Sequence, residues 1–256
     1  MTGKFAGRVV VVTGAAQSLG LECARAFCSE GASVVLVDNN CEKVTAAAEL
    51  LQRSGYRATA TPLDVRSQEQ TITVVDQIFN QLGRLDVWVN NAGVAHHCDT
   101  FNLLPEPWQN SMDVMLTGPF YCCQEAGKIM RMQGGGSIIN MASVNGFVPQ
   151  PRRAAYCTAK AGLIMLTRVL ASEWAQHHIR VNAVAPSPVE ASGMAQSLDD
   201  AGLTSLAHYK TRHPMQRMAQ LREVTDAVLF LASDDASFVT GETLCVDGGW
   251  VAFGSM

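Results

Sequence analysis

The chain has 256 residues, of which 48% are hydrophobic and 16% charged, and its net charge is −4. This balance is typical of a globular protein with a large buried core. The small negative charge offers no basic surface for nucleic acid, so we predict no nucleic-acid partner. We also predict no membrane partner, because no apolar run reaches membrane-spanning length and no signal-peptide core follows the N-terminus.

Eight cysteines are scattered along the chain without any Cys-x-x-Cys spacing. We interpret them as free thiols, which favours a reducing, cytoplasmic location. His96 and His97 are adjacent, so their side chains point apart and would chelate a metal poorly. No further ligand stands at a suitable spacing, so we predict no metal site and expect His96 to line a pocket instead.

Short apolar segments alternate with helical patterns along the whole chain. Strands are predicted at 8–13, 33–38, 56–65, 85–90, 137–143, 179–185 and 242–247, and helices include 107–132, with a kink at Gly118–Pro119, and 154–174. Because there is no repeat and no linker, we predict one domain over residues 1–256. The expected α/β fold is a Rossmann-type doubly wound parallel sheet of about seven strands, with helices on both faces. Residues 190–214 have weak periodicity, and we expect a substrate lid there.

A glycine-containing loop, Gly14-Ala-Ala-Gln17-Ser18-Leu19-Gly20, joins the first strand to its helix. Gly14 permits a tight turn, and Gly20 lets the helix pack closely on the strand. The start of that helix presents N–H groups and a positive dipole end to a pyrophosphate. Ser18 is small and costs little here, and its hydroxyl could reach a phosphate. The sequence therefore predicts a dinucleotide site.

Asp38 ends the second predicted strand. A carboxylate at this place accepts hydrogen bonds from the adenosine ribose and repels a 2′-phosphate. Neither residues 15–18 nor residues 39–40 include an Arg or Lys to receive that phosphate. We therefore predict NAD rather than NADP as the cofactor. The alternative interpretation is that Asp38 only caps the next helix.

Tyr156 and Lys160 lie four residues apart on the predicted helix 154–174, and thus on one face of it. An ammonium beside a phenol lowers the phenol pKa, which a tyrosine needs to act as a base near neutral pH. Ser143, at the end of the strand before, could hold a substrate oxygen. Tyr-x-x-x-Lys alone is common on exposed helices, so its meaning depends on the rest of the chain.

Further motifs decide the matter. In order, the chain carries Thr13-Gly14-x-x-x-x-x-Gly20, Asp38, Asp64-Val65, Asn90-Asn91-Ala92-Gly93, Ser143, Tyr156-x-x-x-Lys160, Arg180-Val181-Asn182 and Asp247-Gly248-Gly249. Over essentially its whole length it resembles the short-chain dehydrogenase/reductase family. The resemblance implies an NAD(H)-dependent oxidoreductase that interconverts a secondary alcohol and a ketone by hydride transfer. It also implies a homotetramer or homodimer.

The resemblance assigns roles to individual residues. Tyr156 would be the general acid/base, Lys160 would lower its pKa and hold the nicotinamide ribose, and Ser143 would orient the substrate. The cofactor-binding residues it implies are Gly14, Gln17, Ser18, Leu19, Gly20, Asp38, Asp64, Val65, Asn91, Ala92, Gly93, Tyr156, Lys160, Pro186 and Val189.

One departure from the family concerns catalysis. Met115 stands where the family usually has an Asn that helps a water pass protons to the lysine. Methionine donates no hydrogen bond and accepts one only weakly. Three alternatives stay open: a different water route, impaired proton exchange with solvent, or a cofactor-binding protein with little turnover.

The substrate is less defined. We expect the pocket to include His96, Asn145, Arg153 and Ser187. Arg153 is interpreted either as a solvated arginine or as an anchor for a carboxylate. The surrounding segments are similar to sugar and polyol dehydrogenases and about equally to 3-hydroxybutyrate dehydrogenases. We predict a sugar, polyol or other small hydroxy compound, with a 3-hydroxy acid as the alternative.

Overall fold

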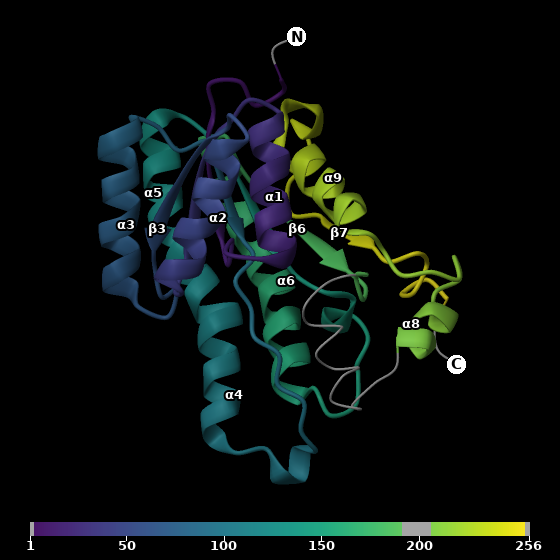
Figure 1. Ribbon diagram of the computed structural model, residues 1–256. Coiled ribbons are helices and arrows are strands. Elements are labelled where there is room, and N and C mark those ends of the chain that lie inside the picture. The colour runs from purple at the N-terminus through teal and green to yellow at the C-terminus, as the bar shows by residue number, and fades with distance from the viewer. Residues whose placement is uncertain (1–2, 191–205, 254–256) are drawn as a thin grey trace.

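The computed structural model describes residues 3–190 and 206–253, and in that part seven parallel strands form one sheet (Figure 1). Their order is β3-β2-β1-β4-β5-β6-β7. The strands are β1 (Val9–Thr13), β2 (Ser33–Asp38), β3 (Arg57–Pro62), β4 (Val87–Asn90), β5 (Gly136–Met141), β6 (Ile179–Pro186) and β7 (Thr243–Val246). The predicted doubly wound parallel sheet is confirmed.

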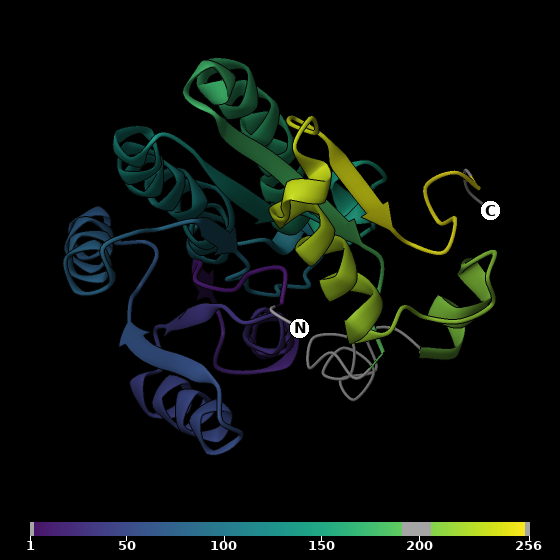
Figure 2. The same ribbon diagram turned by 90° about the horizontal axis from the view of Figure 1, so that it is seen from above.

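Helices cover both faces of the sheet (Figure 2). One face packs against α1 (Ser18–Ser29), α2 (Cys41–Arg53) and α9 (Leu221–Ala232), and the other against α3 (Gln68–Leu82), α5 (Gly118–Gln133) and α6 (Ala154–Trp174). Successive residues of a strand point to opposite faces. Accordingly, Val10 and Val12 belong to one apolar core and Val9 and Val11 to the other. Burial on both sides explains why the strands read as continuous apolar runs.

We expected a kink at Gly118–Pro119. The structure has a π-helical turn directly before these two residues. Helix α4 (Pro105–Met112) runs into this turn, Asp113–Thr117, and α5 continues from Gly118. Pro119 has no N–H for the carbonyl of Met115, four residues earlier. The N–H of Gly118 bonds instead to the carbonyl of Asp113, which is the π pattern. Met115 lies within this turn and is fully buried.

The predicted lid is described only in part, because residues 191–205 lie outside the described ranges. Its second half contains helix α8 (Leu206–Arg212). Tyr209 of this helix is buried with Val144, Met218 and Trp250 in a small apolar cluster. Short 3-10 turns occupy Thr100–Asn102, Val144–Gly146, Ala175–His177 and Asp234–Ala236. The cluster ties α8 to the turn that follows Ser143.

Residues Ala154–His177 form the one described helical stretch that is long and apolar enough to cross a membrane, with a mean hydropathy of 1.2. Half of that window is buried inside the protein. Helix α6 makes its main contacts there with β6 and with the turn after Ser143. Packing against the sheet accounts for its apolar character.

Asp86, directly before β4, allows a test of how much one buried polar contact contributes to stability. Its buried carboxylate accepts from the Val9 N–H at 2.8 Å and from Arg8 at 3.2 Å. Asp86→Ala should lower the free energy of unfolding by about 1–3 kcal/mol, because the Val9 N–H would be left buried without an acceptor. Asp234→Ala removes the exposed partner of the same Arg8 and should cost less than about 0.5 kcal/mol. Urea unfolding followed by circular dichroism measures both. Equal losses would contradict the role given to the Val9 contact.

Candidate active site

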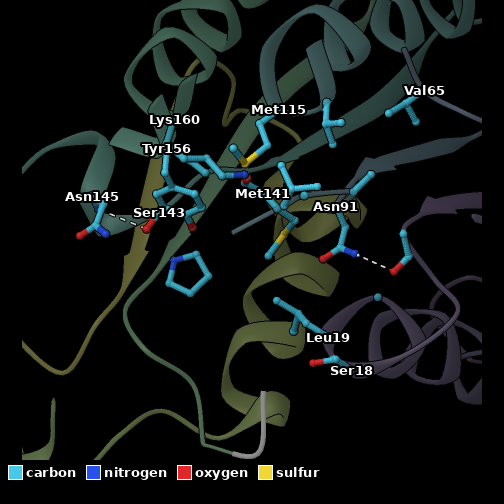
Figure 3. A pocket seen from close by; sticks show the side chains of 18 of the residues that line it. Ser18, Leu19, Val65, Asn91, Met115, Met141, Ser143, Asn145, Tyr156 and Lys160 are labelled. Carbon is cyan, nitrogen blue, oxygen red and sulfur yellow. Dashed lines mark hydrogen bonds between the residues drawn. The ribbon is translucent and has the colours of Figure 1, made fainter. Parts of the chain in front are cut away.

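A cavity of about 630 Å³ opens at the carboxyl ends of the strands, where a doubly wound sheet binds its ligands. It brings together nearly all the residues predicted from the sequence (Figure 3). Those that line it are Gly14, Gln17, Ser18, Leu19, Gly20, Asp38, Asp64, Val65, Asn91, Ala92, Gly93, Ser143, Asn145, Arg153, Tyr156, Lys160, Pro186, Ser187 and Val189. His96 is half-buried and does not line this cavity.

The glycine loop brings backbone segments into close contact at Gly14 and Gly20. A Cβ on Gly14, whose φ is 64°, would lie 2.8 Å from the Cα of Ala92. A Cβ on Gly20 would lie 2.1 Å from the carbonyl oxygen of Gly14, so no side chain fits at either position. Helix α1 begins at Ser18, and no side chain caps its first N–H groups. These free donors and the helix dipole suit a phosphate.

Ser18 differs from our expectation. We expected the serine to cost little because it is small. In the structure its φ is 51°, in the left-handed region that glycine tolerates. A non-glycine residue there costs about 1–2 kcal/mol. The loop therefore carries backbone strain at the point where it turns into α1.

Asn91 braces the loop rather than extending into the cavity as a free amide. Its Nδ2 donates to the carbonyls of Thr13 at 3.0 Å and Gly14 at 3.1 Å. The Thr13 hydroxyl in turn accepts the N–H groups of Asn91 and Ala92, both at 3.0 Å. These four bonds hold the ends of β1 and β4 together. Asn91 is therefore a positioning residue for the loop.

Two carboxylates mark the far half of the cavity. Asp38, at the end of β2, accepts from the N–H of Ala16 at 3.3 Å and from that of Asn40 at 3.0 Å. Asp64 is paired with the guanidinium of Arg66, whose hydrogen bonds are the main reason that the pKa of Asp64 lies below its ordinary value. Arg66 lines the cavity and was missed in the sequence, although it follows the Asp64-Val65 motif directly.

The catalytic candidates lie at the other end, around the turn after β5. Tyr156 is buried, and burial is the main cause that raises the pKa of its phenol. Hydrogen bonding with Ser143 and the positive charge of Arg153 lower that pKa in opposition. The Ser143 hydroxyl also accepts the N–H of Asn145 at 3.2 Å (Figure 3). The serine is thus held in place beside the phenol.

Lys160 is placed differently from our expectation. We expected its ammonium beside the Tyr156 phenol, lowering the phenol pKa. Its Nζ donates to the carbonyl of Met141 at 2.6 Å and lies 5.8 Å from the centroid of the tyrosine ring. Burial lowers the pKa of Lys160 itself to about 8. The positive charge that acts on the phenol in this structure comes from Arg153.

Met115 lines the cavity and is itself fully buried. It packs in a small apolar cluster with Tyr156 and Ala159 (Figure 3). Its sulfur lies 3.8 Å from the position that a Cβ on Gly93 would take. One side of Tyr156 is therefore packed against apolar atoms.

The substrate half of the cavity is polar. Asn145 donates to Gln150 at 2.9 Å, and Gln150 reaches the Tyr209 hydroxyl at 3.4 Å. The Ser187 hydroxyl lies 2.7 Å from Nε2 of His213. The sequence analysis did not predict Tyr209 as a pocket residue, because it stands in a weakly periodic segment. The available signal was that Tyr209 is the one Phe, Trp or Tyr residue between 190 and 214.

Comparison with known proteins places the chain among oxidoreductases. A family model described as enoyl-(acyl carrier protein) reductase matches residues 14–251. The cis-4-hydroxycyclohexanecarboxylate dehydrogenase of Sinomonas cyclohexanicum is 39% identical over 249 residues, which are 97% of this chain and 98% of that protein. The structure of a gluconate 5-dehydrogenase from Burkholderia cenocepacia J2315 in complex with NADP and tartrate has 32% identity and a TM-score of 0.92, covering 97% of this chain and 96% of that one. NAD+-bound xylitol dehydrogenase has 31% identity and a TM-score of 0.92, covering 96% of this chain and all of that one.

The sheet, the glycine loop and these relatives define an oxidoreductase that uses a nicotinamide cofactor and acts on CH–OH groups. The chain belongs to the short-chain dehydrogenase/reductase family.

The burial of Lys160 predicts a pH dependence of stability. Its pKa falls from 10.5 when exposed to about 8 in the folded protein, so between these values the unfolded chain binds more protons. The free energy of unfolding should rise through this interval by roughly 3 kcal/mol. Below about pH 8 the folded protein bears the full cost of the buried ammonium.

Lys160→Met should lack this rise. Urea unfolding of the cofactor-free protein at pH 7.5, 9 and 10 measures it as the difference between wild type and variant, which cancels all other titrations. If the two free energies change in parallel, the lysine is not destabilised by burial.

Proposed function

We propose that this protein is an NAD(H)-dependent dehydrogenase that interconverts the secondary alcohol of a small hydroxy compound with the corresponding ketone. The observation that carries the proposal is the placement of Ser143, Tyr156 and Lys160 in the same cavity as the glycine loop. The residues present fit the cofactor, because the cradle at Gly14 and Gly20 admits no side chain and the start of α1 is uncapped. The loop would hold the pyrophosphate, Asp38 the adenosine ribose, and Lys160 the nicotinamide ribose.

The residues of the chain divide the work of the reaction. When bound, the nicotinamide supplies the acceptor or donor of the hydride. Tyr156 takes the hydroxyl proton of the alcohol during oxidation and returns it during reduction. Ser143 holds the same oxygen by a hydrogen bond. Oxidation thus removes one hydride and one proton from the substrate, and the proton leaves through Tyr156.

The preference for NAD rests on Asp38. Its carboxylate ends β2, where it would meet the ribose hydroxyls and repel a 2′-phosphate. The related structures include one with NADP and one with NAD+, so the family does not decide the question. Arg66 is the nearest cation that lines this half of the cavity, and Asp64 already pairs with it.

The relatives support two kinds of substrate. One relative is named for xylitol, a polyol, and others for hydroxycyclohexanecarboxylate and gluconate, which are hydroxy acids. The amides and hydroxyls of Asn145, Gln150 and Ser187 suit a substrate with several polar groups. We therefore keep a sugar or polyol and a hydroxy acid as the two candidates at this level.

Three further expectations remain proposals. We propose a homotetramer or homodimer, supported by the exposed apolar side chains Phe120, Met165 and Val169 on α5 and α6. We propose a cytoplasmic location, supported by eight unpaired cysteines. We also propose that residues 1–256 are one domain.

Met115 favours a second candidate, a cofactor-binding protein with little turnover. Its side chain is fully buried beside Tyr156 and offers no donor to a water that would pass protons onward. The three intact catalytic candidates argue against this reading.

Turnover separates the two functions. The purified protein should oxidise NADH with a panel of ketones and keto acids, and Tyr156→Phe should reduce kcat by at least about a hundredfold while NADH fluorescence still reports binding. Met115→Asn, assayed in parallel, should change kcat by less than about tenfold. If wild type is inactive until asparagine is introduced, the binding-protein reading is correct.

Asp38→Asn tests the cofactor. Removing the charge should raise the ratio of kcat/KM for NADP to that for NAD by about tenfold or more, because repulsion of the 2′-phosphate is lost. Glu42→Gln is the matched control, because it removes an exposed carboxylate in the first turn of α2 that does not line the cavity. A ratio that moves equally in both variants would remove Asp38 as the selecting residue.

A further inference from the structure

Arg153 is a buried cation without a counterion among the described residues. Only 6% of the residue is exposed, and two of its nitrogens, Nε and Nη2, are buried without any hydrogen-bond partner there. The one polar contact of its side chain with the described residues joins Nη1 to Gln150 Oε1 at 3.5 Å, the outer limit of a hydrogen bond. A buried charge is costly unless it is paired. The guanidinium is therefore prepared for an anion that the described chain does not supply.

The backbone directs this side chain inward. Arg153 is the N-cap residue of α6, and Arg152 before it has a φ of 65°, a strained value for a residue with a side chain. The guanidinium carbon of Arg153 lies 4.8 Å from the centroid of the Tyr156 ring. Arg153 also lines the cavity with Asn145 and Ser187. An anion bound to it would lie in the substrate half, next to the reacting phenol.

We propose that the substrate is a hydroxy acid whose carboxylate is bound by the Nε–Nη2 edge of Arg153. This inference rests on the proposed dehydrogenase function and names its substrate class. Nε and Nη2 are neighbours on one side of the guanidinium, so their two N–H groups point the same way. That fork matches the two oxygens of a carboxylate in a bidentate pair.

The surroundings favour a carboxylate over a phosphate ester. The amides of Asn145 and Gln150, which line the same cavity, carry no charge and are hydrogen-bonded to each other, so they do not add a second cation for a dianion. Burial and the charge of Arg153 lower the pKa of His97, which keeps that imidazole neutral. Lys160 is directed to the carbonyl of Met141. The Nε–Nη2 edge of Arg153 offers one pair of N–H donors and one positive charge, which matches a ligand with a single negative charge.

The position of Arg153 also limits the size of the acid. Because the guanidinium lies over the ring that carries the acid/base phenol, the carboxylate and the reacting hydroxyl must be separated by only a few bonds or by a compact ring. Compact hydroxy acids meet this condition. Long-chain hydroxy acids, with a distant carboxylate, do not.

The test compares acids with neutral analogues of the same shape. The wild-type protein is assayed with NAD and cis-4-hydroxycyclohexanecarboxylate, 3-hydroxybutyrate and gluconate, each against its primary amide, and with glycerol 1-phosphate. At least one acid should exceed its amide in kcat/KM by about tenfold to a hundredfold, the worth of a charge-assisted hydrogen-bond pair. A preference for the phosphate ester, or equal values for acid and amide, would overturn the proposal.

Variants assign that preference to Arg153. Arg153→Gln should abolish the acid-to-amide ratio mainly through a higher KM for the acid, and Arg153→Lys should restore part of it as a single point charge. Arg152→Gln is the matched control, because it removes an exposed positive charge one residue away and should leave the ratio unchanged. If Arg153→Gln lowers acid and amide equally, the arginine does not bind a carboxylate.

A binding measurement distinguishes two outcomes: that Arg153 does not bind a carboxylate, and that the protein is not a dehydrogenase. Calorimetric titration of the NADH-loaded protein with cyclohexanecarboxylate and with cyclohexanecarboxamide requires no turnover. Tighter binding of the acid in wild type, lost in Arg153→Gln, supports the anchor even if no alcohol is oxidised. Activity on neutral alcohols without any acid-selective binding would support the dehydrogenase and refute the anchor.

Discussion

The hydrogen bonds between Thr13 and Asn91 are the constraint on which the site depends. They join the ends of β1 and β4, the two strands at which the sheet reverses its direction of winding. At the same junction Gly14 lies so close to Ala92 that a Cβ on it would be 2.8 Å from the Ala92 Cα. Once this junction is set, the glycine loop on one side and Ser143 on the other face the same cavity. Neither half of the site would have its geometry without the other.

The site concentrates costs that the apolar cores offset. Lys160 and Arg153 are buried cations, and Ser18 and Arg152 hold left-handed backbone conformations. Left-handed backbone also occurs outside the cavity, at His178 and Gln216. The buried guanidinium of Arg153, with two unpartnered nitrogens, is the cost that a ligand could offset by pairing with it.

Much of this could be predicted from the sequence. Helix α6 was predicted with its observed bounds, Ala154–Trp174, and the strand periodicity was sufficient for the doubly wound sheet. Side-chain direction was not predictable in the same way. The spacing of Tyr156 and Lys160 places them on one face, but whether the ammonium turns to the phenol or to the carbonyl of Met141 depends on a strand distant in sequence. The left-handed φ of Ser18 is likewise not indicated by its sequence neighbours.

Charge around Tyr156 connects the mechanism with substrate choice. The phenol is buried against Met115 and Ala159, so its ionisation is disfavoured unless a cation compensates. In the described chain that cation is Arg153, which stands on the substrate side rather than the cofactor side.

A carboxylate that paired with Arg153 would neutralise part of the positive charge acting on the phenol and would raise the phenol pKa again. Arg153 without a partner would then favour the phenolate, and Arg153 paired with the acid would favour the phenol. Such a balance suits a residue that must both accept and return a proton.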